Sequence, residues 1–219
     1  MIEIKNIEKN FGNNHVLKNV SFLFERGKTN LIIGESGSGK TTLIKVLIGL
    51  HKIDSGIVLF DGVDFNAIKT KEQRLLRQEI GMLFQGGALY DYMSVEENIM
   101  FPLNMFTEKT EIEKLERVNL CLKRVKLEGK NGLMPSELSG GMTKRVAIAR
   151  AVINEPKLIF ADEPTGNLDC LSTKAILEVI SQLNIEFGVS FVLVTHDHNA
   201  AAMMDRILSL EKGILGSKS

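Results

Sequence analysis

The sequence predicts an α/β fold in which helices cover both faces of a parallel sheet. Segments 158–161 (LIFA) and 191–194 (FVLV) are continuous apolar runs, as expected of strands that are buried on both faces. Segment 28–50 reads as a strand, a glycine-rich turn and a helix, because Leu43 and Leu47 fall on one helical face. These observations predict an α/β domain that takes in most of the 219-residue chain.

The first 85 residues contain further strand patterns. Residues 1–7 alternate between apolar and polar, and residues 15–27 read as a second strand that ends in a turn. A short strand at 55–62 lies between glycine turns, and another strand is expected at 79–85, ending at Gln85. The early strands predict a small antiparallel β region, and the last one belongs to the parallel core.

A helical insertion is expected between Gly86 and about Asn154. Ser94 and Glu97 have the spacing of a capping box, which marks the start of a helix. Residues 109–125 form an amphipathic pattern, and a further helix starts in the segment LSGGM. After Pro156 the strand patterns return. They lie at 157–163, 189–197 and 206–213.

The composition is that of an ordinary globular protein. Apolar residues make up 44% and charged residues 25%, and 27 basic residues balance 27 acidic ones. This balance gives no reason to expect a nucleic-acid partner. The longest apolar run is about eight residues, well short of the roughly twenty that span a bilayer, and no signal peptide is expected. Cys121 and Cys170 are isolated, which favours a reducing compartment and two buried thiols.

The turn after the first core strand has the pattern G-x-x-x-x-G-K-[ST], with a strand before it and a helix after it. Its glycines let successive backbone N–H groups converge on phosphates, and the helix start adds positive charge. Lys40 is expected to reach the β- and γ-phosphates, Thr41 to hold Mg²⁺, and Thr42 to meet the α-phosphate. The expected nucleotide contacts are Gly34, Glu35, Ser36, Gly37, Ser38, Gly39, Lys40, Thr41 and Thr42.

Two adjacent carboxylates, Asp162 and Glu163, stand where an apolar strand leaves the sheet. Ligands of parallel sheets bind at this edge. We expect Asp162 to hold Mg²⁺ through water and Glu163 to act as general base on the attacking water. Adjacent carboxylates alone are more often a solvated turn, and the phosphate-binding turn is what favours the functional interpretation.

A second phosphate-type turn is formed by Ser139, Gly140 and Gly141 at the start of a helix. Taken alone, this is an ordinary helix cap. The turn belongs to the helical insertion, however, and Lys40 belongs to the sheet edge. We therefore expect it to serve the nucleotide of another molecule, so that two copies pack head to tail with ATP between them.

Five motifs in this order closely resemble the ATP-binding subunits of ABC transporters. They are GESGSGKTT, the strand-ending Gln85, LSGGM, IFADEPTGNLD and VTHD. The resemblance extends over essentially the whole chain. It implies a single ABC ATPase domain, residues 1–219, with the P-loop NTPase fold and ATP and Mg²⁺ as ligands. Residues 1–85 and 155–219 form the RecA-like nucleotide-binding core with its antiparallel β subdomain, and residues 86–154 form the helical subdomain.

The resemblance also implies roles for single residues. Gln85 looks like the glutamine that senses Mg²⁺ and the attacking water, and His196 like the switch histidine that contacts the γ-phosphate. Asp169 resembles the aspartate that links the two sites across the dimer. Phe11 stands where the family places an aromatic ring against adenine. A histidine at a strand end or a phenylalanine near a strand is, in other contexts, more often structural.

The segment 86–102 carries the two tyrosines of the chain, Tyr90 and Tyr92, with Phe101 and Pro102 nearby. Aromatic enrichment suits a protein interface. We expect a groove here that receives a short helix of an integral membrane permease, which would place the chain in the cytoplasm, on the cytoplasmic face of the inner membrane. Local core packing is the alternative.

The motifs divide between subfamilies. Segment 81–103 and Met142 resemble the ATPases of MCE-type (Mla-like) phospholipid transporters, whereas DEPTGNLD resembles lipoprotein-release, macrolide-export and cell-division ATPases. Phospholipid transport is the favoured interpretation. A soluble mechanical ABC ATPase and a non-hydrolysing regulator are the other classes. The first lacks support because the chain has no long coiled coil, and the second because Glu163 and His196 are both present.

Overall fold

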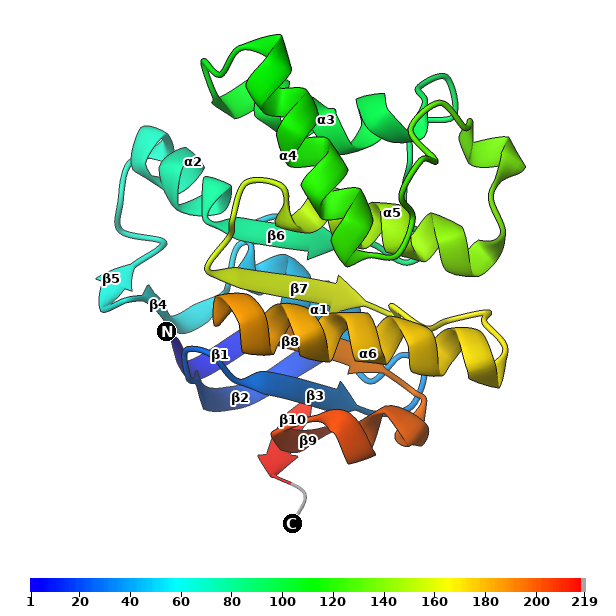
Figure 1. The fold of residues 1–219 in the computed structure, drawn as a ribbon. Coiled ribbons are helices and arrows are strands. Elements are labelled where there is room, and N and C mark those ends of the chain that lie inside the picture. The colour runs from blue at the N-terminus through cyan, green and yellow to red at the C-terminus, as the bar shows by residue number, and fades with distance from the viewer. Residues whose placement is uncertain (218–219) are drawn as a thin grey trace.

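Two sheets and a group of helices make up residues 1–217, the part of the chain that the computed structural model describes, apart from the side chains of residues 198, 199 and 217. Figure 1 shows the larger sheet with a helix across its front and a cluster of helices beyond its upper edge. The larger sheet has the strand order β10-β9-β3-β8-β7-β6, and it is parallel except for the pair β9–β10. Its strands are β3 (Thr29–Ile33), β6 (Ile80–Leu83), β7 (Leu158–Asp162), β8 (Ser190–Thr195), β9 (Arg206–Glu211) and β10 (Ile214–Ser217).

The smaller sheet is antiparallel between the paired strands and has the order β2-β1-β4-β5. Its strands are β1 (Ile2–Phe11), β2 (Asn14–Phe24), β4 (Ser55–Phe60) and β5 (Val63–Asp64). The expected parallel core and the expected antiparallel β region near the N-terminus are therefore both confirmed.

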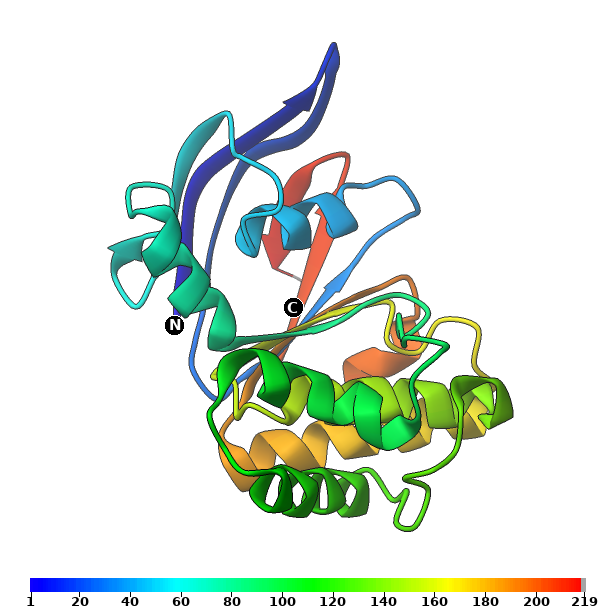
Figure 2. The same cartoon turned by 90° about the horizontal axis from the view of Figure 1, so that it is seen from above.

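The helices fall into two groups. Helices α3, α4 and α5 follow one another between β6 and β7, whereas α1, α2 and α6 lie in the rest of the chain (Figures 1 and 2). The bounds are α1 (Lys40–Leu47), α2 (Thr70–Gln78), α3 (Val95–Phe106), α4 (Glu111–Arg124), α5 (Gly140–Val152) and α6 (Cys170–Phe187), with 3-10 turns η1 (Pro135–Glu137) and η2 (His198–Met203). The capping box at the start of α3 is present, because Glu97 N donates to Ser94 Oγ and Ser94 N to Glu97 Oε2.

Side chains alternate across the larger sheet and build a core on each face. Leu31 and Ile33 of β3 pack in one apolar cluster with α3, α4, α5 and α6. Ile32, between them in sequence, packs in the other cluster with α1 and the smaller sheet. Because each face buries large aliphatic groups, each worth about 1.5–3 kcal/mol on transfer from water, the strands have little freedom to change register.

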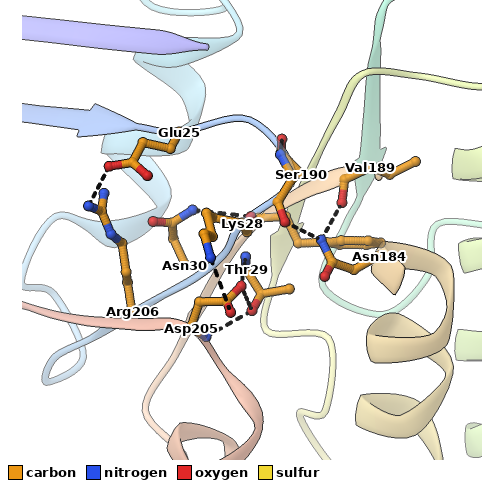
Figure 3. Close-up of polar contacts among 11 residues, drawn as sticks. Glu25, Lys28, Thr29, Asn30, Asn184, Val189, Ser190, Asp205 and Arg206 are labelled. Carbon is orange, nitrogen blue, oxygen red and sulfur yellow. Dashed lines mark hydrogen bonds and ion pairs between the residues drawn. The ribbon is translucent and has the colours of Figure 1, made fainter. Parts of the chain in front are cut away.

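A reciprocal polar contact fixes the end of β3 that is farthest from the glycine-rich turn (Figure 3). Thr29 N donates to Asp205 Oδ2 at 2.7 Å, and Asp205 N donates to Thr29 Oγ1 at 2.9 Å. Lys28 Nζ lies 3.9 Å from the same carboxylate. The contact ties the start of β3 to the residue before β9, its neighbour in the sheet.

Three expectations need correction. The strand β6 ends at Leu83, so Gln85 lies in a turn and does not end the strand. The chain leaves the sheet there because Gly86 and Gly87 both have positive φ, at 84° and 83°. Cys121 is buried as expected, but Cys170 is exposed at the first residue of α6. Helices α2 and α6 were not expected from the sequence.

Among the helices of residues 1–217, none combines the length and apolar character that crossing a bilayer requires.

Candidate functional site

The glycine-rich turn between β3 and α1 holds a buried cation. Lys40 Nζ donates to the carbonyl oxygens of Gly34 and Glu35, at 2.7 and 2.9 Å, so its own loop fixes the ammonium. Gly34 has no room for a side chain, because a Cβ there would lie 2.3 Å from the carbonyl oxygen of Leu210. The turn thus places an ammonium group beside the positive start of a helix, which is an arrangement that binds anions.

The glycine-rich turn contains a buried hydroxyl group, that of Ser38, without a hydrogen-bond partner among the described residues. The residue is only 8% exposed. A buried hydroxyl of this kind is costly unless an acceptor meets it. The turn also lines a cleft of about 810 Å³ that β9 and β10 close on the other side. The cleft and the unpaired donor fit a phosphate-bearing ligand.

Oxygen atoms from two distant segments meet beside the turn. Thr41 Oγ1 donates to Asp162 Oδ1 at 3.2 Å. Asp162 is 7% exposed, and burial raises the pKa of its carboxyl group. A divalent cation would offset the effect of burial on this carboxylate, and hydroxyl and carboxylate oxygens are the ligands that Mg²⁺ prefers. These residues fit a Mg²⁺ site.

Glu163 is held by the neighbouring strand. Thr195 Oγ1 donates to Glu163 Oε2 at 2.9 Å, and His196 Nδ1 lies 3.1 Å from Oε1. The residue is 9% exposed, whereas 71% of the His196 side chain is exposed. The carboxylate is therefore positioned from β8 while the imidazole can reach a ligand.

Gln85 and Phe11 occupy the margins of this site. Gln85 is exposed in the turn that follows β6, at the same sheet edge as Asp162 and His196. Phe11, at the end of β1, is 45% exposed and meets His51 edge-on with ring centroids 5.3 Å apart. The ammonium of Lys9 lies over the ring of Phe11, with Nζ 5.2 Å from the ring centroid, as in a cation–π contact.

The second phosphate-type turn lies elsewhere. Ser139 caps α5, and its Oγ accepts from Met142 N at 3.3 Å. A Cβ at Gly141 would lie 3.3 Å from Ser172 Oγ, so the turn abuts the start of α6. There Asp169 caps α6, accepting from Ser172 N at 2.9 Å. In Figure 2, α1 lies among the strands and α5 lies in the helical part of the molecule. The structure brings the Ser139–Gly141 turn close to Asp169 but leaves it in a different part of the molecule from Lys40.

Three residues at this site were not singled out from the sequence. Thr195 holds the Glu163 carboxylate, as described above. Lys144 Nζ donates to the main-chain oxygen of Glu163 at 3.1 Å. Arg150 donates to the carbonyl oxygens of residues 87 and 88, each at 2.8 Å, and so fixes the segment after Gln85. A sequence signal exists for Lys144, because Ala147 and Ile148 place it on the apolar stripe of its helix.

Comparison with known proteins agrees with this geometry. The model of the ABC transporter family matches residues 17–166. The lipoprotein-releasing system ATP-binding protein LolD of Shewanella denitrificans is 42% identical over 201 residues, which are 91% of this chain and 86% of LolD. The methionine import ATP-binding protein MetN of Campylobacter jejuni is 41% identical, over 99% of this chain and 70% of MetN.

Solved structures extend the comparison to the fold. The ATP-binding cassette MJ0796, a dimer in a post-hydrolysis state bound to ADP and Pi, superposes with a TM-score of 0.89 at 35% identity. The match covers 99% of this chain and 98% of MJ0796. The fold is thus that of a P-loop NTPase cassette, and the chain belongs to the ABC transporter family as one of its ATP-binding, ATP-hydrolysing domains.

Proposed function

We propose that this chain is the ATP-hydrolysing motor of a membrane transporter and works as a head-to-tail pair of subunits. Each ATP would lie between the Lys40 turn of one subunit and the Ser139–Gly141 turn of the other. The observation that supports this most strongly is the separation of two phosphate-type turns in a single chain (Figure 2). Beyond capping α5, the second turn has no role at a nucleotide bound by the Lys40 turn of the same chain.

Within each site the residues divide the work. Lys40 and the turn residues from Gly34 to Thr42 bind the phosphates. Thr41, Asp162 and Gln85 would hold Mg²⁺, which would neutralise phosphate charge. Thr195 and His196 orient the carboxylate of Glu163, which accepts a proton from the attacking water. The remaining contacts with the nucleotide or across the pair come from Phe11, Ser139, Gly140, Gly141 and Asp169.

Mixing two inactive variants tests the paired site. Lys40→Ala removes the phosphate-binding cation, and Ser139→Glu places a negative charge on the second turn. Each variant alone should lack ATPase activity. An equal mixture should recover about a quarter of wild-type activity, since half of the random pairs carry one intact site. A mixture that stays inactive, or a monomer with full activity, would contradict the paired site.

The membrane partner would dock in a groove beside the sheet edge. The groove has a volume of about 400 Å³ and is lined by aromatic and arginine side chains, among them Phe84, Tyr90, Phe101, Phe106 and Arg150. Tyr92 adds an exposed ring whose centroid is 5.8 Å from that of Tyr90. We propose that a short helix of an integral membrane permease binds near residues 86–102, which holds the chain on the cytoplasmic face of the inner membrane.

Arg150 gives this groove a physical connection to the nucleotide site. It fixes the carbonyl groups of Gly87 and Ala88, and Gln85 lies two residues before Gly87. We propose that a change at Gln85 would reach the groove through this segment of a few residues.

For the cargo, we propose phospholipid moved between the membranes of a bacterial envelope. The support is the likeness of segment 81–103 and Met142 to MCE-type ATPases. Lipoprotein release, macrolide export and a role in cell division are the alternatives. LolD and a macrolide export protein are each 42% identical to this chain, which supports the first two alternatives alike.

Purification of the native membrane complex, followed by mass spectrometry of bound lipid and protein, tests the cargo. The control is a parallel purification of the Tyr92→Glu variant, which carries the same affinity tag but lacks the aromatic ring proposed to bind the permease. Phospholipid should be enriched in the wild-type sample relative to this control. Enrichment of lipoproteins without phospholipid would replace the proposal with its alternative.

A further inference from the structure

Lys144 is a buried lysine that the reaction described so far does not use. It is 4% exposed and lies five residues after Ser139, on α5. Burial lowers the pKa of Lys144, while the nearby charges of Glu163 and Asp162 oppose that effect. Lysine is almost never buried without a partner, and here the partner is the main-chain oxygen of Glu163, 3.1 Å from Nζ.

The backbone of Glu163 is itself unusual. Its φ is 48°, in the left-handed region that residues with a side chain rarely adopt. Such conformations persist only where the surroundings determine them. Here Glu163 N donates to the carbonyl oxygen of Val194 at 2.9 Å, and the Glu163 carbonyl accepts from Gly166 N at 3.1 Å as well as from Lys144. Lys144 is the side chain that completes this set.

We infer that Lys144 is a positioning residue for hydrolysis, which holds the Glu163 peptide so that its carboxylate meets Thr195 and His196. The inference rests on the proposed paired site. One helix then serves two nucleotides: the start of α5 binds the partner's ATP, and Lys144, about one turn later, orients the general base of its own chain. The ammonium also balances two adjacent carboxylates, which would otherwise repel each other in a buried site.

Substitution of the lysine separates positioning from binding. Lys144→Met keeps the length of the side chain but removes the donor and its charge. Because a small misplacement of a catalytic group is costly, kcat should fall on the order of 10²-fold, with KM for ATP and the thermal midpoint unchanged. Lys144→Gln retains an N–H donor and should recover part of kcat. Lys123→Met, an exposed lysine on α4, is the matched control and should behave as wild type.

Two results would overturn the inference. One is a wild-type kcat for Lys144→Met. The other is a loss of ATP binding or of folding that accompanies the loss of kcat and is shared by Lys144→Gln, because that pattern belongs to a residue that only supports α5.

Mixed pairs give a sharper test. In the mixture described above, the single intact site combines Lys40 and Glu163 of the Ser139→Glu chain with Ser139 of the Lys40→Ala chain. Adding Lys144→Met to the Ser139→Glu chain should abolish the recovered activity. Adding it to the Lys40→Ala chain should leave that activity, since the Glu163 beside it serves the inactive site.

The two placements also separate the possible failures. If the recovered activity is lost only when Lys144→Met is in the Lys40→Ala chain, then Lys144 acts through the Ser139 turn. That result would contradict the inference. A parental mixture without activity would overturn the paired site instead, and the kcat values of Lys144→Met and Lys144→Gln would then decide the role of Lys144.

Discussion

Thr41 Oγ1 and Asp162 Oδ1 lie 3.2 Å apart although 121 positions separate them in the chain. Thr41 follows the turn after β3, and Asp162 ends β7, which is separated from β3 by β8 in the sheet. Both strands are parallel, so their carboxyl ends face the same edge. The fold, not the local sequence, brings these two oxygen atoms together.

Thr41→Ala should raise the Mg²⁺ concentration needed for half-maximal ATPase activity by roughly 10–100-fold, because one of the oxygen ligands is lost. A Mg²⁺ titration at constant ATP measures the effect. Thr41→Ser keeps the hydroxyl and serves as the control. An unchanged requirement in Thr41→Ala would show that the metal is held elsewhere.

Glu163→Gln should bind ATP normally and lose about 10²–10⁴ in hydrolysis rate, which corresponds to about 3–5 kcal/mol of barrier. The amide keeps the shape of the side chain but cannot accept the proton of water. Equilibrium ATP binding and single-turnover hydrolysis measure the two effects. Glu186→Gln, an exposed carboxylate near the end of α6, should change neither; normal turnover in Glu163→Gln would place the base at another residue.

Tyr90→Glu and Tyr92→Glu should abolish recruitment to membranes that contain the permease, while ATP binding stays intact. The two rings stand 36% and 75% exposed, so the substitutions change the groove without emptying the core. Co-sedimentation with native membrane vesicles measures recruitment. Ile185→Glu, at an apolar position on α6 that is about as exposed as Tyr92, is the control. Recruitment of all three variants would rule out this groove.

The contact between Asp205 and Thr29 should make stability depend on pH. The Thr29 amide, first, and its hydroxyl lower the pKa of Asp205 in the folded chain. A carboxyl with a lowered folded pKa stabilises the fold above its unfolded pKa, about 3.9, and loses that contribution as pH falls through the folded value. Between pH 6 and pH 3, the free energy of unfolding measured in urea should therefore fall less for Asp205→Asn than for wild type. Equal losses would mean that Asp205 carries no part of the dependence.

The local motifs made much of this site predictable. Strand, turn and helix follow one another around Lys40, and Asp162 and Glu163 follow an apolar strand, so their shared edge could be inferred from chain order. By contrast, α2 is a nine-residue helix with no fully buried side chain, and its few apolar residues make its helical period hard to read from the sequence. Both ends of helix α6 are marked in the sequence, because Asp169 is a favoured N-cap residue and Gly188 a favoured residue just after a helix. These two markers were not used to predict the helix.

Contacts between distant elements were beyond prediction. Lys144 reaches the residue after β7 only because α5 packs against β6 and α6, and the sequence around LSGGM does not determine that packing. Arg150 likewise meets Gly87 and Ala88 across 63 and 62 positions. Such pairs depend on where each helix packs on the sheet, and the periodic pattern of apolar residues within one segment does not determine that position.

The attachment of α3, α4 and α5 has a mechanical consequence. The chain leaves the sheet at the carboxyl end of β6 and returns at the amino end of β7, and these two strands are parallel neighbours. The line between these two connections runs along the strands. A movement of the three helices relative to the sheet would turn about this hinge line and would repack α5 against β6 and α6. Such a swing would move the Ser139–Gly141 turn toward or away from a facing subunit while Lys40 stays in place. The hydrogen bond from Lys144 to the main chain of Glu163 crosses this hinge line, so such a movement would act directly on the residue proposed as general base.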